Sequence, residues 1–288
     1  MARPAASHIH DALTSLLPPR RVRELAREFG VVQRRRKLDI VALVYALALG
    51  FSVGDRRTLS GLRRAYLRAT GSRLAPSSFH ARFSAAMVKL VRTLAIEALG
   101  TLARTRPRLR SVLAPFVDVL AVDSALLRLH DALKPFYPSV WTHYMKASAK
   151  LTVVMNVVAR GARTVRLAHG SRHDRHLLRA GPWMKGRLLL FDLGFYAAPL
   201  FLQIHRHGGY FLSRARKHAN PTIVAAHRAA QRHLVGMKLR DALPLLGTDT
   251  LDVEVEMVYQ RHHRRSPRVT SHHARFRFVA VYNHEHQR

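Results

Sequence analysis

The sequence predicts an α+β protein, with an N-terminal helical domain followed by a mixed α/β sheet that carries a β-rich insertion. Up to about residue 104, apolar residues recur at intervals of three and four. After the linker RTRPRLR, short β-branched runs alternate with helical segments. Near the end of the chain, apolar and polar residues alternate singly. We place the helical domain at residues 1–110, the sheet at 111–235 and the insertion at 236–288.

The helical domain is predicted from four segments: RRVRELAREFG, KLDIVALVYALALGF, TLSGLRRAYLRATG and SSFHARFSAAMVKLVRTLAIEALGTLAR. Gly71 is placed to end the third helix, and Ser77 or Ser78 to cap the fourth. These two helices would form a pair that resembles a helix-turn-helix. The arginines that would contact DNA are Arg63, Arg64, Arg68, Arg73 and Arg82. A plain helical hairpin with a solvated arginine face is the alternative.

The sheet domain is predicted from the order of its strands and helices. Strands are expected at 116–123, 151–158, 163–168, 187–192 and 210–214, with a short helix at 173–179 and a longer one at 196–207. The later segments VEVEMVY and ARFRFVAVY alternate with period two and predict an antiparallel hairpin or a small β-region joined by a basic loop.

The charge of the chain points to a polyanionic partner. Lysine and arginine total 49 residues against 17 acids, a formal net charge of +32. Because such a charge repels itself, nucleic acid is the natural partner. A GC-rich genome could account for part of the arginine excess, but it would not make acids scarce. In the basic loop QRHHRRSPRVTSHH, Arg264 and Arg265 are further candidates for DNA contacts.

Composition also excludes several classes of protein. The chain has no cysteine, which rules out disulfides, thiolate zinc sites and cysteine nucleophiles. The longest apolar run, at 40–51, is about 12 residues and too short to span a bilayer. The N-terminus lacks the apolar core of a signal peptide. We therefore expect a cytoplasmic protein with no membrane association.

Two aspartates carry the candidate chemistry. Asp123 in VLAVDSALLRL and Asp192 in RLLLFDLGFY each follow an apolar strand run, which places them at the carboxyl edge of a sheet. Either one alone is more often a strand-end cap. However, a three-strand meander followed by a helical crossover lets the fourth strand return parallel to the first. The carboxylates would then converge and would repel each other unless Mg²⁺ or Mn²⁺ bridged them.

A site with two such ions suits phosphodiester chemistry. Ions about 3.5–4 Å apart can activate a water or hydroxyl on one side of the phosphorus and stabilise the leaving oxygen on the other. DNA cleavage or strand transfer is the reaction that this geometry serves.

The motifs around both aspartates resemble those of a known family. Val122-Asp123-Ser124 and LLLFDLGFY at 188–196 are similar to the first and second acid motifs of IS-four-type insertion-sequence transposases, which use three acids (DDE). The similarity spans roughly residues 35–288 and includes GLRRAYLRATG, SSFHARF, HGSRHDRHLL and FRFVAVYNHE. It implies a ribonuclease-H-like catalytic domain in which Asp123 and Asp192 hold the metal ions. Leu193 stands where this family commonly has arginine.

The resemblance also implies where the protein works and with what. Its substrate would be double-stranded DNA at insertion-sequence ends, in a bacterial cytoplasm in association with the nucleoid. A homodimer on DNA is a further expectation.

The third acid of the family has no counterpart here. Its signature is Y-x2-R-x3-E-x6-K on a helix, and nothing after Asp192 matches it. Glu285 follows Tyr282 at the wrong spacing, and Glu254 and Glu256 lie in the alternating β-region. We therefore expect a gene that is truncated or split by a frameshift, and a chain with little or no independent catalysis.

Three functions stay open at this point: a transposase, a non-catalytic DNA-binding remnant of one, and an unrelated basic RNA-binding protein whose two aspartates are coincidental. Two smaller histidine features have simple structural explanations. His173 and Asp174 fit a helix cap, with a supporting role near the site as the alternative. The adjacent histidine pairs His262/His263 and His272/His273 fit a polyanion-binding loop better than a metal site.

Overall fold

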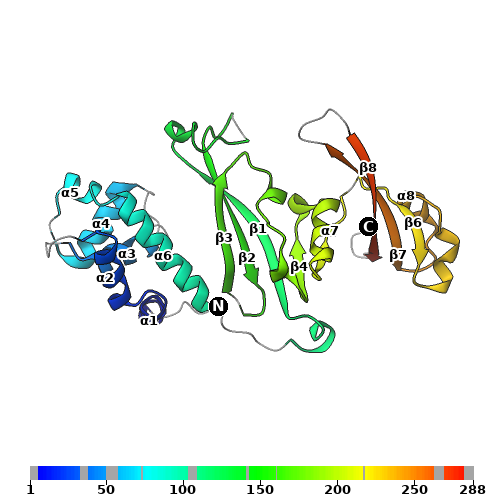
Figure 1. Cartoon of the computed structure of the whole chain (residues 1–288), viewed down its shortest axis with the longest axis horizontal. Coiled ribbons are helices and arrows are strands. Elements are labelled where there is room, and N and C mark those ends of the chain that lie inside the picture. Colours follow the sequence, from blue (N-terminus) through cyan, green and yellow to red (C-terminus); the bar gives the residue numbers. More distant parts are fainter. Residues whose placement is uncertain are drawn as a thin grey trace. The chain divides into compact units, whose positions relative to one another are not determined.

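The computed structural model describes residues 6–32, 38–49, 58–72, 74–102, 109–140, 143–159, 161–216, 218–262 and 269–281. The chain divides into two compact units. The first holds residues 1–106 with Gly161–Arg163, and the second holds 107–160 with 164–288. Helices make up the N-terminal unit and two sheets lie in the other, which confirms the predicted α+β class (Figure 1).

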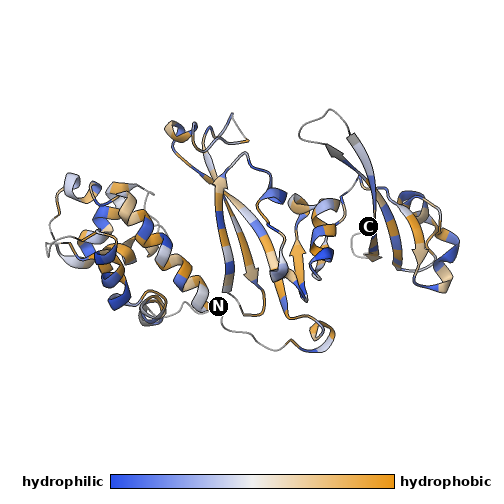
Figure 2. Ribbon diagram, in the orientation of Figure 1, coloured by the Kyte–Doolittle hydropathy of each residue, from blue (hydrophilic) through white to orange (hydrophobic). Residues whose placement is uncertain are grey.

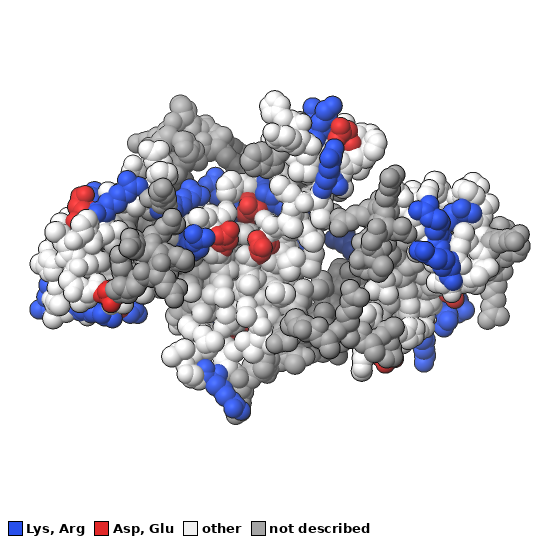
Figure 3. Space-filling model, turned by 180° about the vertical axis from the view of Figure 1, so that it is seen from behind, with Lys and Arg blue, Asp and Glu red and all other residues white. Residues whose placement is uncertain are grey.

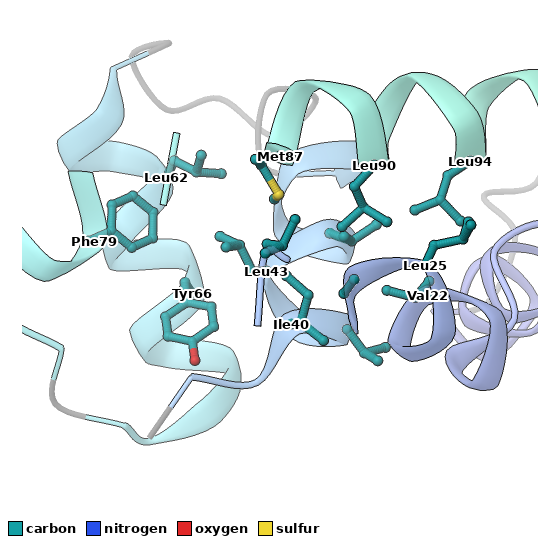
Figure 4. Packing of buried hydrophobic residues seen from close by; sticks show 14 of the residues in the cluster. Val22, Leu25, Ile40, Leu43, Leu62, Tyr66, Phe79, Met87, Leu90 and Leu94 are labelled. Atoms are coloured by element: carbon teal, nitrogen blue, oxygen red, sulfur yellow. The ribbon is translucent and has the colours of Figure 1, made fainter. Parts of the chain in front are cut away.

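The N-terminal unit has one more helix than expected near its start, and the long fourth segment is divided in two. Its helices are α1 (Ala6–Leu16), α2 (Pro19–Glu28), α3 (Ile40–Leu49), α4 (Leu59–Thr70), α5 (Pro76–His80) and α6 (Ala85–Leu102). Buried apolar side chains from α2 to α6 meet in a single cluster (Figure 4). Tyr66 and Phe79 are fully buried in it and connect α4 to α5. None of the described helices is both long and apolar enough to cross a membrane.

The caps of α4 and α5 were partly predictable. Thr58 caps α4 by accepting a hydrogen bond from the Gly61 N–H at 3.1 Å. Gly71 ends the helix in the left-handed conformation at φ 64°, as expected, because glycine adopts positive φ without a steric penalty. The expectation for Ser77 or Ser78 was wrong. Ala75 is the N-cap of α5 and Pro76 is its first residue, so both serines lie inside the helix.

The first sheet has five strands in the order β3-β2-β1-β4-β5. They are β1 (Asp118–Arg128), β2 (Ser148–Asn156), β3 (Gly161–His169), β4 (Arg187–Phe191) and β5 (Tyr210–Ser213), with α7 (Ala198–Arg206) between the last two. β1 pairs antiparallel with β2 and parallel with β4. The return of the fourth strand beside and parallel to the first is therefore confirmed (Figure 1).

Short 3-10 helices connect these elements: η1 (Ser111–Leu113), η2 (Asp131–Leu133), η3 (Asp174–His176), η4 (Pro182–Met184) and η5 (Leu193–Phe195). The short helix expected at 173–179 is thus the single turn η3. One face of the sheet packs against α7 and η5, and its core includes Leu120, Leu189 and Phe201.

The second sheet has the order β6-β7-β8 and contains the predicted hairpin. Its strands are β6 (Thr222–Ala226), β7 (Thr250–His262) and β8 (Val269–Val281), and η6 (Ala229–Leu234), α8 (Leu239–Ala242) and η7 (Leu243–Leu245) lie between β6 and β7. Hydrophobic and hydrophilic residues alternate along β7 (Figure 2). Phe276 of β8 packs edge-on against Phe201 and Phe211, which stack at 4.1 Å, so an aromatic cluster connects the two sheets.

A buried ion pair fixes the start of the β1–β4 pairing. Asp118 and Arg187 are register partners, and Arg187 Nε lies 2.9 Å from Asp118 Oδ2. Both residues are buried, and Asn156 of β2 donates a further hydrogen bond to Asp118 Oδ1 at 2.9 Å. A slip of one residue between β1 and β4 would separate these charges in a buried place, which is costly.

We predict that Arg187→Met destabilises the second unit by about 3–5 kcal/mol, because it leaves a buried carboxylate without its cation. Asp131→Asn is the matched control, since Asp131 and Lys146 form an exposed pair at 3.9 Å and such pairs contribute about 1 kcal/mol or less. Chemical denaturation measures both. Equal losses for the two variants would contradict the assigned role of the buried pair.

Candidate active site

The β1–β4 register brings Asp123 and Asp192 together. The parallel pairing runs from Asp118 opposite Arg187 to Val122 opposite Phe191. Asp123 and Asp192 are the next residues on the two chains, and neighbouring strands lie about 4.8 Å apart. Both side chains are exposed, although the strand residues just before them, Val122 and Phe191, are buried.

Asp123 does not end its strand, as the sequence suggested. β1 continues to Arg128, because β2 pairs with it as far as Arg128 opposite Ser148. The strand that ends at this point is β4, at Phe191. Asp123 is thus the first residue of β1 that has lost its parallel neighbour, and Asp192 is the first residue after β4.

The end of β4 also leaves a backbone donor for Asp123. The N–H of Leu129 donates towards β2, to the carbonyl of Ala147. Because N–H groups alternate along a strand, the N–H of Ser124 points to the opposite edge, where β4 has stopped. It donates instead to Asp123 Oδ1 at 2.7 Å, which orients the carboxylate.

The donor set at this edge fits a hard divalent cation. Within the described residues, neither Asp123 nor Asp192 forms an ion pair, although the chain has 49 lysines and arginines. A few acidic side chains lie near one another on the face drawn in Figure 3. Two adjacent carboxylates repel without a cation between them, and carboxylate oxygens are ligands that Mg²⁺ and Mn²⁺ accept.

A third acid lies beside these motifs but is turned to other partners. Asp174 Oδ1 accepts a hydrogen bond from Ser124 Oγ at 2.7 Å and lies 2.9 Å from Lys150 Nζ. Lys150 is buried in β2. Lys150 was not predicted as a site residue, and Ser124 was named only as part of the motif around Asp123; a lysine inside the apolar run ASAKLTVVMN was the available signal.

The cap at this turn is His173. Its Nδ1 accepts from the Arg175 N–H, which confirms the cap and leaves the Asp174 carboxylate for the contacts above. Burial lowers the pKa of His173, and the neighbouring Arg175 lowers it further.

The segment after Asp192 is anchored to the second sheet. Tyr196 closes η5, and its hydroxyl contacts Met257 Sδ of β7 at 3.5 Å. The Arg216 guanidinium lies 5.3 Å from the centre of the Tyr196 ring. Burial raises the pKa of Tyr196, against the opposing effect of Arg216. Tyr196 therefore fixes the loop that begins at Asp192 from its far end.

The arginines predicted to bind DNA have different surroundings. Arg64 and Arg68 are exposed on α4. Arg63 is half-buried, and its Nε donates to the Leu74 carbonyl at 2.8 Å, so this arginine holds the turn after α4. Arg82 lies in the turn between α5 and α6, and its Nε is buried with no partner among the described residues. The other three, Arg73, Arg264 and Arg265, lie outside the described residues.

No third acid joins Asp123 and Asp192 in the described part of the chain, where no group of three or more histidines and acids could hold a metal ion. Glu254 and Glu256 lie in β7. Glu256 is engaged by His273 and Arg275 of β8, whose hydrogen bonds lower the pKa of its carboxyl. Glu285 lies outside the described residues.

The family of the chain follows from a comparison with known proteins. Residues 115–281 match the family model of the transposase DDE domain, which is more than half of the 288 residues. The chain belongs to the DDE transposase family. The match begins just before β1 and runs to the end of β8, so it covers both aspartates and both sheets. A search of curated proteins found no match.

Membership of this family confirms the broad predictions from the sequence. The chain is a DDE transposase with an α+β, ribonuclease-H-like fold. The family implies DNA as the substrate, and DDE domains generally use divalent metal ions. The IS-four subtype and the truncation of the gene stay predictions.

We predict that Asp123→Asn and Asp192→Asn each weaken Mn²⁺ binding by more than about tenfold, because even the hydrogen-bond partners of metal ligands contribute about 10–100-fold. The free Mn²⁺ signal in electron paramagnetic resonance measures this during a titration. Asp131→Asn, which removes an exposed carboxylate in the same unit, should bind as the wild type does. Unchanged binding in both site variants would contradict the metal site.

Proposed function

We propose that this transposase cleaves and transfers DNA strands at insertion-sequence ends, through a site to which the chain contributes Asp123 and Asp192. The observation that supports this is their adjacent position at the end of the β1–β4 pairing. Two exposed carboxylates without a cation partner are costly to keep side by side unless they serve a ligand.

In this proposal the two aspartates act as metal ligands. Asp123 would use the oxygen that remains available beside its bond to the Ser124 N–H, and Asp192 would contribute from the loop anchored by Tyr196. Bound Mg²⁺ or Mn²⁺ would activate the attacking water or hydroxyl and stabilise the leaving oxygen of the phosphodiester. The aspartates thereby orient the scissile phosphate at the edge of the sheet.

The DNA itself would be held by the basic surface. The net charge of +32 attracts a polyanion such as DNA to the protein as a whole. On α4, Arg64 and Arg68 lie four residues apart, so they share one face of the helix and could reach neighbouring phosphates. A protein that acts on bacterial DNA in this way would work in the cytoplasm with the nucleoid, and two copies would be needed to join two ends.

A second function is favoured by the absence of a third acid beside the pair in the described residues. We propose that the chain by itself binds DNA but cleaves it poorly. Without the third carboxylate, the second ion would lose a ligand and the phosphate part of its alignment. Removing one group that acts within a unit commonly abolishes most of the rate.

We predict salt-sensitive, weakly sequence-selective binding to duplex DNA, with log affinity falling steeply as log salt rises. Replacing both Arg64 and Arg68 by glutamine should reduce the salt slope by about 2, since each phosphate contact contributes about 1. Arg20→Gln is the control, because it removes an exposed arginine of α2, outside the predicted helix pair. Fluorescence anisotropy measures the affinity. An affinity that is unchanged between about 50 and 300 mM salt would contradict binding through phosphate contacts.

We predict that the chain nicks and joins a plasmid carrying its own gene and flanking DNA poorly or not at all in Mg²⁺ or Mn²⁺. A version extended by a helix with the Y-x2-R-x3-E-x6-K signature should gain both activities, and Asp123→Asn should abolish them. Strong activity of the unextended chain that is lost in Glu285→Ala would show that the site is completed by another route.

A further inference from the structure

We infer that Asp174 is a positioning residue. From the face of the sheet opposite Asp123, it holds the two segments that carry Asp123 and Asp192. This inference rests on the proposed metal site, because it concerns the placement of Asp123 and Asp192. The family match covers residue 174 but does not assign it a role.

Asp174 first fixes the segment that carries Asp123. Ser124 Oγ donates to Asp174 Oδ1 at 2.7 Å, while the Ser124 N–H donates to Asp123. Neighbouring side chains of a strand point to opposite faces, so Ser124 and Asp123 lie on opposite sides of β1. The Asp174 carboxylate therefore holds β1 from the face opposite Asp123, at the point where β4 no longer supports it.

Asp174 also meets the segment that carries Asp192. A Cβ placed on Gly194 would lie 3.0 Å from Asp174 Oδ2. That contact is tighter than a side chain normally tolerates. Because Asp174 is held by Ser124 and Lys150, it cannot easily move aside. Gly194 thus allows η5 to lie close to the carboxylate. Asp174 therefore contacts Ser124, which follows Asp123, and lies near Gly194, which follows Asp192.

An ion pair with Lys150 holds the Asp174 carboxylate on the face of the sheet opposite Asp123. The amino group of Lys150 lies 2.9 Å from Asp174 Oδ1, and about a tenth of the lysine side chain is exposed. The charges of Lys150 and Asp174 cancel, so the Asp174 carboxylate is already compensated without a metal ion. A charge-assisted contact of this kind is stronger than one between neutral groups.

The loop that delivers Asp174 is built for a close approach to β2. The Gly170 N–H donates to the Ser148 carbonyl at 2.7 Å, and a Cβ on Gly170 would lie 1.8 Å from Ser148 Oγ. Only glycine fits at this position. Ser148 and Lys150 are two residues apart on the same face of β2, so the close approach at Gly170 brings η3 over Lys150.

The test has two readouts on Asp174→Asn and Ser124→Ala, with Asp131→Asn as the control. Hydrogen exchange should quicken at 120–127 and at 190–196 in Asp174→Asn and not in the control. Mn²⁺ affinity should fall on the order of tenfold in both variants, the loss expected when a metal ligand loses its supporting partner. Ser124→Thr keeps the hydroxyl and should restore the affinity.

The combined variant Asp174→Asn with Ser124→Ala decides how Asp174 acts. If it acts partly through Ser124, the double variant loses little more than Asp174→Asn alone, since Ser124→Ala removes a contact that Asp174→Asn has already weakened. Fully additive losses, or Mn²⁺ affinity that is unchanged in Asp174→Asn while exchange quickens, overturn the positioning role. An intact affinity in Ser124→Ala with all binding lost in Asp174→Asn would make Asp174 a metal ligand instead.

Failure of the metal site is distinguishable from failure of this inference. A wild-type chain that binds Mn²⁺ no better than Asp123→Asn contradicts the site itself. The exchange data then still decide whether Asp174 holds the two segments, and unchanged exchange at both would overturn the inference.

Discussion

The parallel register between β1 and β4 is the constraint on which the site depends. It starts with Asp118 opposite Arg187 and advances one residue at a time on both strands. It ends at Val122 opposite Phe191, and Asp123 and Asp192 are the next residues on the two chains. The buried ion pair at the start of the pairing and the two exposed carboxylates at its end therefore depend on the same alignment. A slip by one residue would break the first and separate the second.

The acidic residues in and around this sheet fall into two groups, those with a cationic partner and those without one. Asp118 is buried and paired with Arg187, and Asp174 is paired with Lys150. Asp123 and Asp192 have no such partner among the described residues. In a chain with so few acids and so many cations, two neighbouring exposed carboxylates without an ion-pair partner are suited to bind a cation from outside. Divalent cations, which the family uses, have the required charge and ligand preference.

The sequence was sufficient for what depends on local pattern and general topology. The apolar runs before Asp123 and Asp192 predicted their strands, and the helical crossover predicted a parallel return. The extension of β1 to Arg128 was not predictable, because it depends on pairing with β2 far along the chain. Contacts between distant segments, such as Asp174 with Lys150 and Arg63 with Leu74, leave no periodic signal. Ala75 replaced the expected serine cap because Pro76 already suits the first turn.

We propose that Asp123 and Asp192 share a divalent ion. Anomalous diffraction from a crystal containing Mn²⁺ would locate that ion. The expected result is a manganese peak within about 2.0–2.6 Å of a carboxylate oxygen of each aspartate. Cβ atoms more than about 12 Å apart would contradict it, because ligand bonds of that length cannot span the gap. So would manganese bound elsewhere with this edge of the sheet empty.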